Sequence, residues 1–140
     1  MKIKRLMVRD VVTVQAEDSA HDAVRLMNKN RIGCLVTTYD GRVYGILTER
    51  DLLERVLEKC KDPKETMVSE IMTSGVIVGD PDMHLDDATR VMFENKVKKL
   101  PIVKGSRLVG LVTLTDIARA TSIDKKTVEL FEKLSNIHTI

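Results

Sequence analysis

The sequence has few aromatic residues and few cysteines, and both shortages exclude classes of protein. Aromatic residues make up 3% of the 140 residues, with two Tyr, two Phe and no Trp. A platform that stacks nucleic-acid bases is therefore not expected, and the formal net charge of +2 gives no concentrated basic face. Two cysteines, Cys34 and Cys60, are too few for a disulfide framework. No His has ligand spacing with a Cys, so neither a metal site nor a nucleic-acid partner is predicted.

Long apolar runs and catalytic motifs are also missing. No apolar stretch reaches the roughly 18 residues that span a bilayer, and residues 1–6 lack the apolar core of a signal peptide. We therefore expect a cytoplasmic protein without membrane contact. No Ser lies in a strained glycine elbow, nothing orders a triad, and no Walker-type loop occurs. No catalytic residue is predicted, and the protein is not expected to be an enzyme.

What the sequence does contain is a duplication. Residues 45–51 read Gly-Ile-Leu-Thr-Glu-Arg-Asp, and residues 110–116 read Gly-Leu-Val-Thr-Leu-Thr-Asp. The same shift of 65 residues places Met7 on Met72 and Asp22 on Asp87 without a gap. A repeat this long indicates two copies of one folding unit rather than a chance match.

Each copy has the pattern of a β-α-β-β-α unit. Strands are predicted at short apolar or β-branched runs, which are residues 11–14, 32–38, 42–47, 76–78, 100–103 and 108–112. Helices are predicted where apolar residues recur at helical spacing, which is from residue 19 to a close at 28–31, at residues 48–60 and 85–92, and from 113 onward. Asp40-Gly41 predicts a tight turn, and Ser19 with Asp22 predicts a helix cap.

The domain boundaries follow from the duplication and from the polar stretch near Pro63. We expect a first repeat at 1–60, a linker at 61–67, a second repeat at 68–121 and a C-terminal helical extension at 122–140. The expected fold class is α/β (α+β). Each small sheet leaves an apolar face unburied, so the two pseudo-symmetric repeats are expected to dock through their sheets. Further burial through the helices of a second chain predicts a homodimer, whose arrangement the sequence does not give.

The repeated Gly-x-x-Thr-x-x-Asp motif has two interpretations. Thr48 with Asp51, and Thr113 with Asp116, match a capping box, which begins many helices that bind no ligand. The second interpretation adds the glycine, which in a strand indicates close approach of another backbone or of a ligand. A strand that leads directly into a helix start favours an anion there. The Thr hydroxyl can donate to a phosphate and the Asp carboxylate can accept from a ribose diol, which is chemistry for a nucleotide.

With these residues the chain resembles a tandem pair of CBS (cystathionine β-synthase) domains over roughly residues 3–121. Both copies have a Met-containing turn, a short strand, a helix, an apolar strand and then Gly-apolar-x-Thr-x-x-Asp before the last helix. The second copy also has the family's frequent Leu-Pro-apolar strand at residues 100–102, whereas residues 33–36 of the first read Gly-Cys-Leu-Val. The two sites are therefore expected to be unequal.

The resemblance implies two related clefts for an adenosine compound, namely AMP, ADP, ATP or S-adenosylmethionine, which the sequence does not rank. In one cleft it implies Asp51 on ribose, Thr48 on phosphate and Ile46 against adenine. The partners from the second half are then Thr73, Ile77, Val97 and Lys98. The other cleft takes Asp116, Thr113 and Leu111, with Val8, Val12, Ile32 and Gly33 crossing over. Arg50 lies inside the first motif where Thr115 lies in the second, so the Asp51 cleft is expected to favour the more anionic ligand.

The predicted function is adenine-nucleotide sensing by a regulatory module. Ligand binding changes its conformation or its affinity for a regulated protein that the sequence does not identify. The alternative is a scaffold or interaction protein whose clefts are unused. Its support is the expected C-terminal helix at 124–136, which carries apolar residues that a partner can bind: Val128, Leu130, Phe131 and Leu134. Titration with the four ligands distinguishes sensing from scaffolding.

Overall fold

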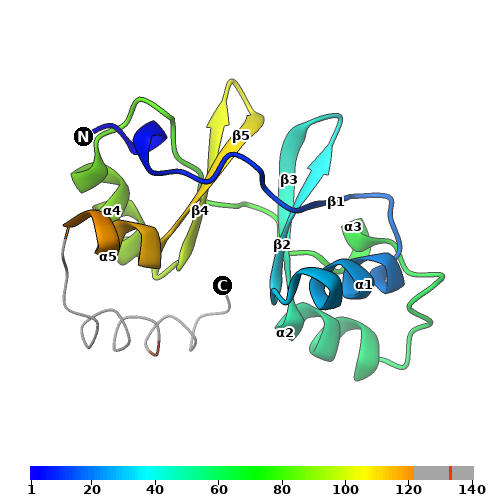
Figure 1. Cartoon of the computed structure of the whole chain (residues 1–140). Coiled ribbons are helices and arrows are strands. Elements are labelled where there is room, and N and C mark those ends of the chain that lie inside the picture. The colour runs from blue at the N-terminus through cyan, green and yellow to red at the C-terminus, as the bar shows by residue number, and fades with distance from the viewer. Residues whose placement is uncertain (122–132, 134–140) are drawn as a thin grey trace. The chain divides into compact units, whose positions relative to one another are not determined.

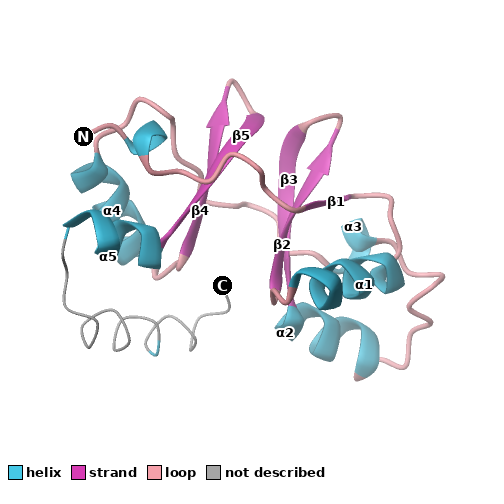
Figure 2. Ribbon diagram, in the orientation of Figure 1, coloured by secondary structure: helices cyan, strands magenta, loops and turns pink. Residues whose placement is uncertain are grey.

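The computed structural model of the chain describes residues 1–121 and residue 133. It divides into two compact units, each of which combines strands and helices (Figures 1 and 2). Of the described residues, 12–76 form the first unit, and residues 1–11 together with residues 77–121 form the second. The first eleven residues therefore belong to the unit of the second repeat.

The sheet of the first unit contains β1 (Thr13–Gln15), β2 (Cys34–Tyr39) and β3 (Arg42–Thr48). Strand β1 runs parallel to β2, and β2 runs antiparallel to β3. The predicted turn at Asp40 and Gly41 joins β2 to β3. Both turn residues have left-handed backbone angles, with φ of 51° and 74°, as a two-residue hairpin of type I′ requires.

Helix α1 (Ala20–Asn30) begins at the predicted cap. The Ser19 hydroxyl accepts from the Asp22 amide at 3.0 Å, and the Asp22 carboxylate accepts from the Ser19 amide at 3.4 Å. The helix ends at Arg31, whose φ of 54° is left-handed. Its apolar face packs into a core with Val14, Leu35, Leu47, Val56, Val68 and Ile71.

The second predicted helix of this unit is formed in two parts, α2 (Glu49–Leu52) and the π-helical segment η2 (Leu53–Leu57). A short helix that the sequence did not predict, α3 (Val68–Ile71), follows it. The stretch expected as a linker lies against the start of α1. There the Ala20 amide donates to the Thr66 carbonyl at 2.8 Å, and the His21 amide donates to the Pro63 carbonyl at 3.0 Å. Residues 61–67 are thus part of the first compact unit.

The second unit contains α4 (Leu85–Asn95), β4 (Lys99–Lys104), β5 (Arg107–Thr113) and α5 (Leu114–Thr121). Strands β4 and β5 are antiparallel. The prediction of a strand at 76–78 was wrong. These three residues do not pair, and the neighbouring Gly79 joins the sheet through a single parallel bridge to Ile102. A β-branched run favours a strand, but a strand forms only where a neighbouring edge is available to pair with it. Here that edge is reached one residue after the run.

The N-terminal segment completes the second unit. It forms one turn of 3₁₀ helix, η1 (Ile3–Arg5), and its Ile3 is fully buried in a core shared with α4, β4, β5 and α5. The Ile3 amide donates to the Met83 carbonyl at 2.9 Å. Lys4 and Lys2 lie 3.1 and 3.5 Å from the Asp82 carboxylate. The hydrogen bond and charge of Lys4, with the charge of Lys2, lower the pKa of Asp82.

In each unit a short stretch of chain pairs with the last strand, and we call it the crossing segment. It contains Val8 beside β5 in the second unit and Thr73 beside β3 in the first. In the second unit the Val8 and Leu111 amides donate to each other's carbonyls, both at 2.9 Å. In the first unit Ile46 and Thr73 make the same pair of hydrogen bonds, at 2.9 and 2.8 Å. These residues correspond through the 65-residue repeat shift, so the two units are built alike even though their crossing segments come from different parts of the chain.

The motif glycines, Gly45 and Gly110, lie where the crossing segment of each unit packs against its last strand. A Cβ on Gly45 would lie 2.7 Å from the Thr73 carbonyl oxygen and 2.6 Å from the Met72 sulfur. A Cβ on Gly110 would lie 2.5 Å from the Met7 sulfur. The sequence left open whether a backbone or a ligand requires these glycines, and in this structure a crossing segment with its Met side chain fills the space.

The expected C-terminal helix at 124–136 lies outside the described residues, residue 133 excepted. Among the residues that are described, no helix is long and apolar enough to cross a membrane.

Candidate functional site

The first motif forms a capping box at the junction of β3 and α2. The Thr48 amide donates to Asp51 Oδ2 at 2.9 Å, and the Asp51 amide donates to Thr48 Oγ1 at 3.2 Å. Strand β3 delivers Thr48 in an extended conformation, with φ of −113°, so that its side chain faces the first helical amides. The capping box that the sequence predicts at Thr48 and Asp51 is therefore present.

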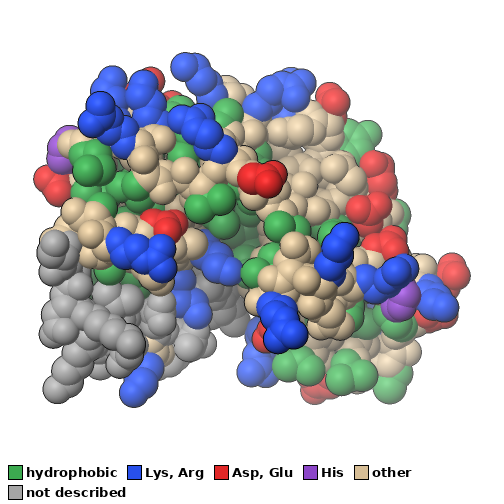
Figure 3. Space-filling model, in the orientation of Figure 1, with side chains coloured by type: hydrophobic (Ala, Val, Ile, Leu, Met, Phe, Trp, Pro, Cys, Tyr) green, Lys and Arg blue, Asp and Glu red, His purple; other side chains and the backbone are tan. Residues whose placement is uncertain are grey.

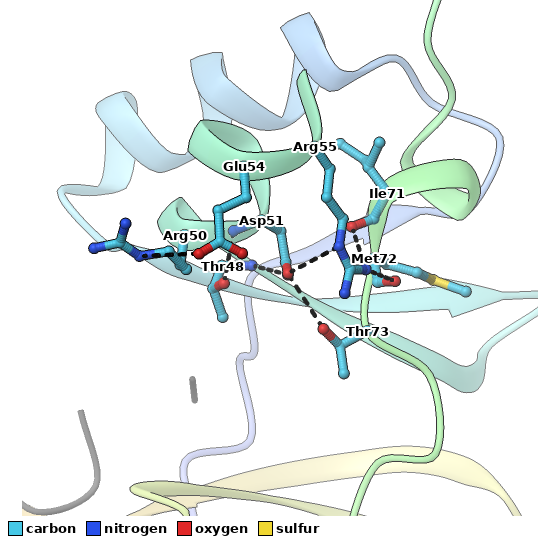
Figure 4. Close-up of polar contacts among 8 residues, drawn as sticks. All are labelled: Thr48, Arg50, Asp51, Glu54, Arg55, Ile71, Met72 and Thr73. Atoms are coloured by element: carbon cyan, nitrogen blue, oxygen red, sulfur yellow. Dashed lines mark hydrogen bonds and ion pairs between the residues drawn. The ribbon is translucent and has the colours of Figure 1, made fainter. Parts of the chain in front are cut away.

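Other side chains hold the second carboxylate oxygen of Asp51 (Figure 4). Asp51 Oδ1 accepts from the Thr73 hydroxyl at 3.3 Å and lies 4.0 Å from Arg55 Nε. Arg55 Nη1 in turn donates to the Ile71 carbonyl at 3.1 Å and to the Met72 carbonyl at 2.9 Å. Asp51 is only 4% exposed. A buried carboxylate with three neighbouring donors is well satisfied and held in one orientation.

The second motif forms the same capping box with fewer neighbours. The Thr113 amide donates to Asp116 Oδ2 at 3.0 Å, and the Asp116 amide donates to Thr113 Oγ1 at 3.2 Å. Within the described part of the chain, Asp116 Oδ1 has no hydrogen-bond or ion-pair partner, and Asp116 is half-buried. At the repeat positions of Thr73 and Arg55 this copy has Val8 and Ala120.

The predicted site residues are divided between the two units. The structure brings Thr73 together with Ile46 and Asp51 in the first unit, and Val8 together with Leu111 in the second. The first unit also holds Thr48, Arg50, Val12, Ile32 and Gly33. The second also holds Ile77, Val97, Lys98, Thr113, Thr115 and Asp116. Two of the cross-repeat partners, Thr73 and Val8, thus share a unit with the aspartate of their cleft. The other cross-repeat partners belong to the opposite unit, and the assignment of all of them to a cleft stays a prediction.

Burial separates the predicted apolar contacts into two groups. Ile46 is 1% exposed and Val97 is 5% exposed, the latter within the core of the second unit. Ile77 and Val8 are 36% and 47% exposed, so their side chains are open to a ligand. The Glu49 side chain covers Gly33. A Cβ added to this glycine would lie 2.6 Å from Glu49 Oε1.

Two features of the site were missed in the sequence. Helix α3 was not predicted, and Arg55 was not assigned a role. The spacing of Arg55, four residues after Asp51 on one helix, is the spacing of a charged pair on adjacent turns. That spacing was the available signal, but nothing in the sequence indicated the carbonyls of Ile71 and Met72. No group of three or more metal-ligating side chains exists among the described residues.

Comparison with known proteins gives the family. The CBS domain family matches residues 3–58 and 68–123, which is most of the chain. The chain therefore belongs to the CBS domain family and contains a tandem pair of its domains. The predicted fold class, with β-α-β-β-α repeats, is confirmed.

Individual relatives resemble the chain over most of its length. It is 34% identical over 116 residues to the CBS domain-containing protein YhcV of Bacillus subtilis, covering 83% of this chain and 82% of that protein. The CBS domain protein TA0289 of Thermoplasma acidophilum has a similar structure, with a TM-score of 0.80 and 28% identity, over 99% of this chain and 77% of that one. A CBS-domain protein of Burkholderia ambifaria, described as a candidate signal-transduction protein, gives a TM-score of 0.71 and 32% identity, over 84% and 86%.

Proposed function

We propose that this chain is a regulatory module that binds an adenosine-containing ligand and changes its conformation, or its affinity for another protein, on binding. The observation that carries the proposal is the Thr-to-Asp junction, which occurs twice with the same hydrogen bonds in a chain of the CBS domain family. The description of the similar Burkholderia protein in terms of signal transduction agrees with a regulatory role. The ligand candidates are AMP, ADP, ATP and S-adenosylmethionine.

Helix capping and ligand binding are compatible at this junction. Each aspartate uses Oδ2 for the cap, and its second oxygen is the acceptor for a ribose diol, which at Asp51 has to replace the Thr73 hydroxyl. Each threonine accepts through Oγ1 and keeps a hydroxyl proton to donate to a phosphate. The cap also fixes the side chain before the ligand arrives, which lowers the entropy lost on binding.

Charge favours a phosphate at the first site. Arg50 has a side chain that is 58% exposed, and its pair with Glu54 is long at 3.9 Å. Such exposed ion pairs are weak, so a ligand phosphate can replace Glu54 as the partner of Arg50. Thr115 occupies the equivalent place in the second motif, and we therefore expect the Asp51 site to prefer the more anionic ligand.

Calorimetric titration of the wild type, Asp51→Ala and Asp116→Ala with each of the four ligands tests the proposal. We expect each substitution to weaken one binding event by about tenfold or more, because a hydrogen-bonded charged acceptor is lost. Asp22→Ala is the matched control, since it removes a capping box of the same chemistry from α1. It should cost about 1 kcal/mol of stability and leave the affinities unchanged.

Two results would contradict this assignment. Unchanged affinity in both Asp51→Ala and Asp116→Ala would remove the two aspartates from the sites. A wild type that responds to none of the four ligands would favour the scaffold alternative.

The module is also expected to be a homodimer. Helix α1, together with α2 and η2, borders a groove of about 440 Å³ with an apolar lining that includes Val24, Met27, Leu53, Val56 and Leu57. Leu53 and Leu57 are 47% and 70% exposed, and Figure 3 displays hydrophobic side chains at the surface near α2 among charged ones. Glu49 lines the same groove, and Arg25 and Lys29 line a neighbouring hollow that shares Asn28 with it, so both signs of charge lie close to the apolar lining. A second copy related by a twofold axis can match such a face to itself.

A further inference from the structure

The two copies of the motif differ in what surrounds the aspartate. In the first unit, Asp51 Oδ1 is occupied by the Thr73 hydroxyl at 3.3 Å, with Arg55 Nε at 4.0 Å. In the second unit, Asp116 Oδ1 has no such partner among the described residues, because Val8 and Ala120 stand at the corresponding positions. Within residues 1–121, the second carboxylate oxygen of the motif aspartate thus has a partner in the first copy and none in the second.

We propose that Thr73 and Arg55 form an internal latch on Asp51, so that the Asp116 site is filled first and the Asp51 site is filled only when the latch opens. This inference rests on the proposed function and adds an order of filling to it. A ribose diol must displace the Thr73 hydroxyl before it reaches Asp51 Oδ1. It must also enter a position where the aspartate is 4% exposed. At Asp116, which is half-buried, the same diol displaces no donor that belongs to the described residues.

The latch also connects the site to a specific segment of the chain. Arg55 donates to the carbonyls of Ile71 and Met72, at 3.1 and 2.9 Å, which lie at the end of α3. The next residue, Thr73, pairs with Ile46 through its backbone and with Asp51 through its side chain. Residues 72–76 are the last of the first unit before the chain enters the second. Opening the latch therefore loosens the stretch through which the chain leaves the first unit.

By thermodynamic linkage, a ligand that opens the latch also increases the population in which residues 72–76 are loosened, and that loosening in turn increases the affinity for the ligand. Arg55 acts here as a positioning residue, since it holds Asp51 and α3 together and is not assigned a ligand contact. Its side chain is 47% exposed, so its replacement is not expected to prevent folding.

The first test needs no ligand. Arg55→Ala gives the first copy the residue that the second copy has, and Arg55→Lys keeps the charge without the planar fork that spans two carbonyls. Amide hydrogen exchange should become faster at Met72 and Thr73 in Arg55→Ala, and by a smaller factor in Arg55→Lys. Unchanged exchange at these amides in Arg55→Ala would overturn the latch, whatever the protein binds.

The second test measures gating with AMP and ATP in an Asp116→Ala background, which leaves the first site alone. Adding Arg55→Ala should raise the affinity of that site by roughly fivefold, the effect of removing one modest competing interaction. An unchanged affinity would overturn the gating, and a lower one would do so by identifying Arg55 as a ligand contact. If exchange rises as expected but no nucleotide binds to the wild type or to any variant, the proposed function fails and gating fails with it.

Discussion

At Gly45 and Gly110 the missing side chain makes room for another part of the same unit. The Met72 and Met7 sulfur atoms would lie 2.6 and 2.5 Å from a Cβ at these glycines. The glycine and the methionine are therefore two halves of one packing contact, and both are repeated at the same 65-residue shift. This contact holds the crossing segment, and with it Thr73 in the first unit, beside the last strand.

Gly45→Ala should destabilise the protein by roughly 1–3 kcal/mol, because the added methyl group meets the Thr73 backbone carbonyl at 2.7 Å. Gly33→Ala is the matched control. The atoms nearest to its methyl group would be side-chain atoms of the exposed Glu49, which can move away, so a cost of about 0.5 kcal/mol or less is expected. Urea unfolding measures both, and equal losses for the two variants would contradict the explanation.

Among the elements, the N-terminal segment has a larger structural role than its position suggests. Ile3 is fully buried although it is the third residue of the chain, and Met7 is 8% exposed. Val68, the residue at the repeat position of Ile3, is likewise fully buried in the first unit. Each unit thus needs a short segment from the start of the other sequence repeat to complete its core.

Ile3→Ala should cost roughly 2–5 kcal/mol, the range for truncating a large buried aliphatic side chain. The loss should be local to the second unit, with faster hydrogen exchange in α4 and β5 and little change in α1 and β2. Val68→Ala should give the reverse distribution. Arg5→Ala, an exposed change in the same turn, serves as the control. Exchange in α4 and β5 that is no faster in Ile3→Ala than in Arg5→Ala would show that the segment is not needed there.

Elements encoded by local sequence were predicted well. The Ser19–Asp22 cap, the Asp40–Gly41 turn and both motif helices depend on hydrogen bonds or backbone angles within a few residues, so their patterns are readable. Features that depend on residues distant in the sequence could not be predicted. The run at 76–78 has a strand composition but lacks a paired edge, and Arg55 bonds to carbonyls sixteen and seventeen residues away. Each predicted cleft also combines residues from both repeats, so its assignment depends on contacts between residues that are distant in the sequence.

At the scale of the whole molecule, the chain interleaves two similar units and makes them unequal. It leaves the second unit after Val11, builds the first unit, and returns after Val76. The sequence duplication explains why the two units have the same fold. They differ at a few equivalent positions, such as Arg55 in the first copy and Ala120 in the second. If the proposed sites bind ligand, this inequality lets one molecule respond to two ligand concentrations.

The exposed groove beside α2 leads to the last prediction, which concerns assembly. Leu57→Glu places a charge at the most exposed apolar position of the groove, where Leu57 is 70% exposed. We expect sedimentation velocity to find a dimer for the wild type and a monomer for Leu57→Glu, because an unpaired buried charge would have to be desolvated in the interface. Tyr44→Glu is the control, since Tyr44 is also exposed at 53% but lies on β3 and does not line the groove. It should stay dimeric. A wild type that sediments as a monomer at tens of micromolar, or a Leu57→Glu variant that stays dimeric, would rule out this groove as the interface between copies.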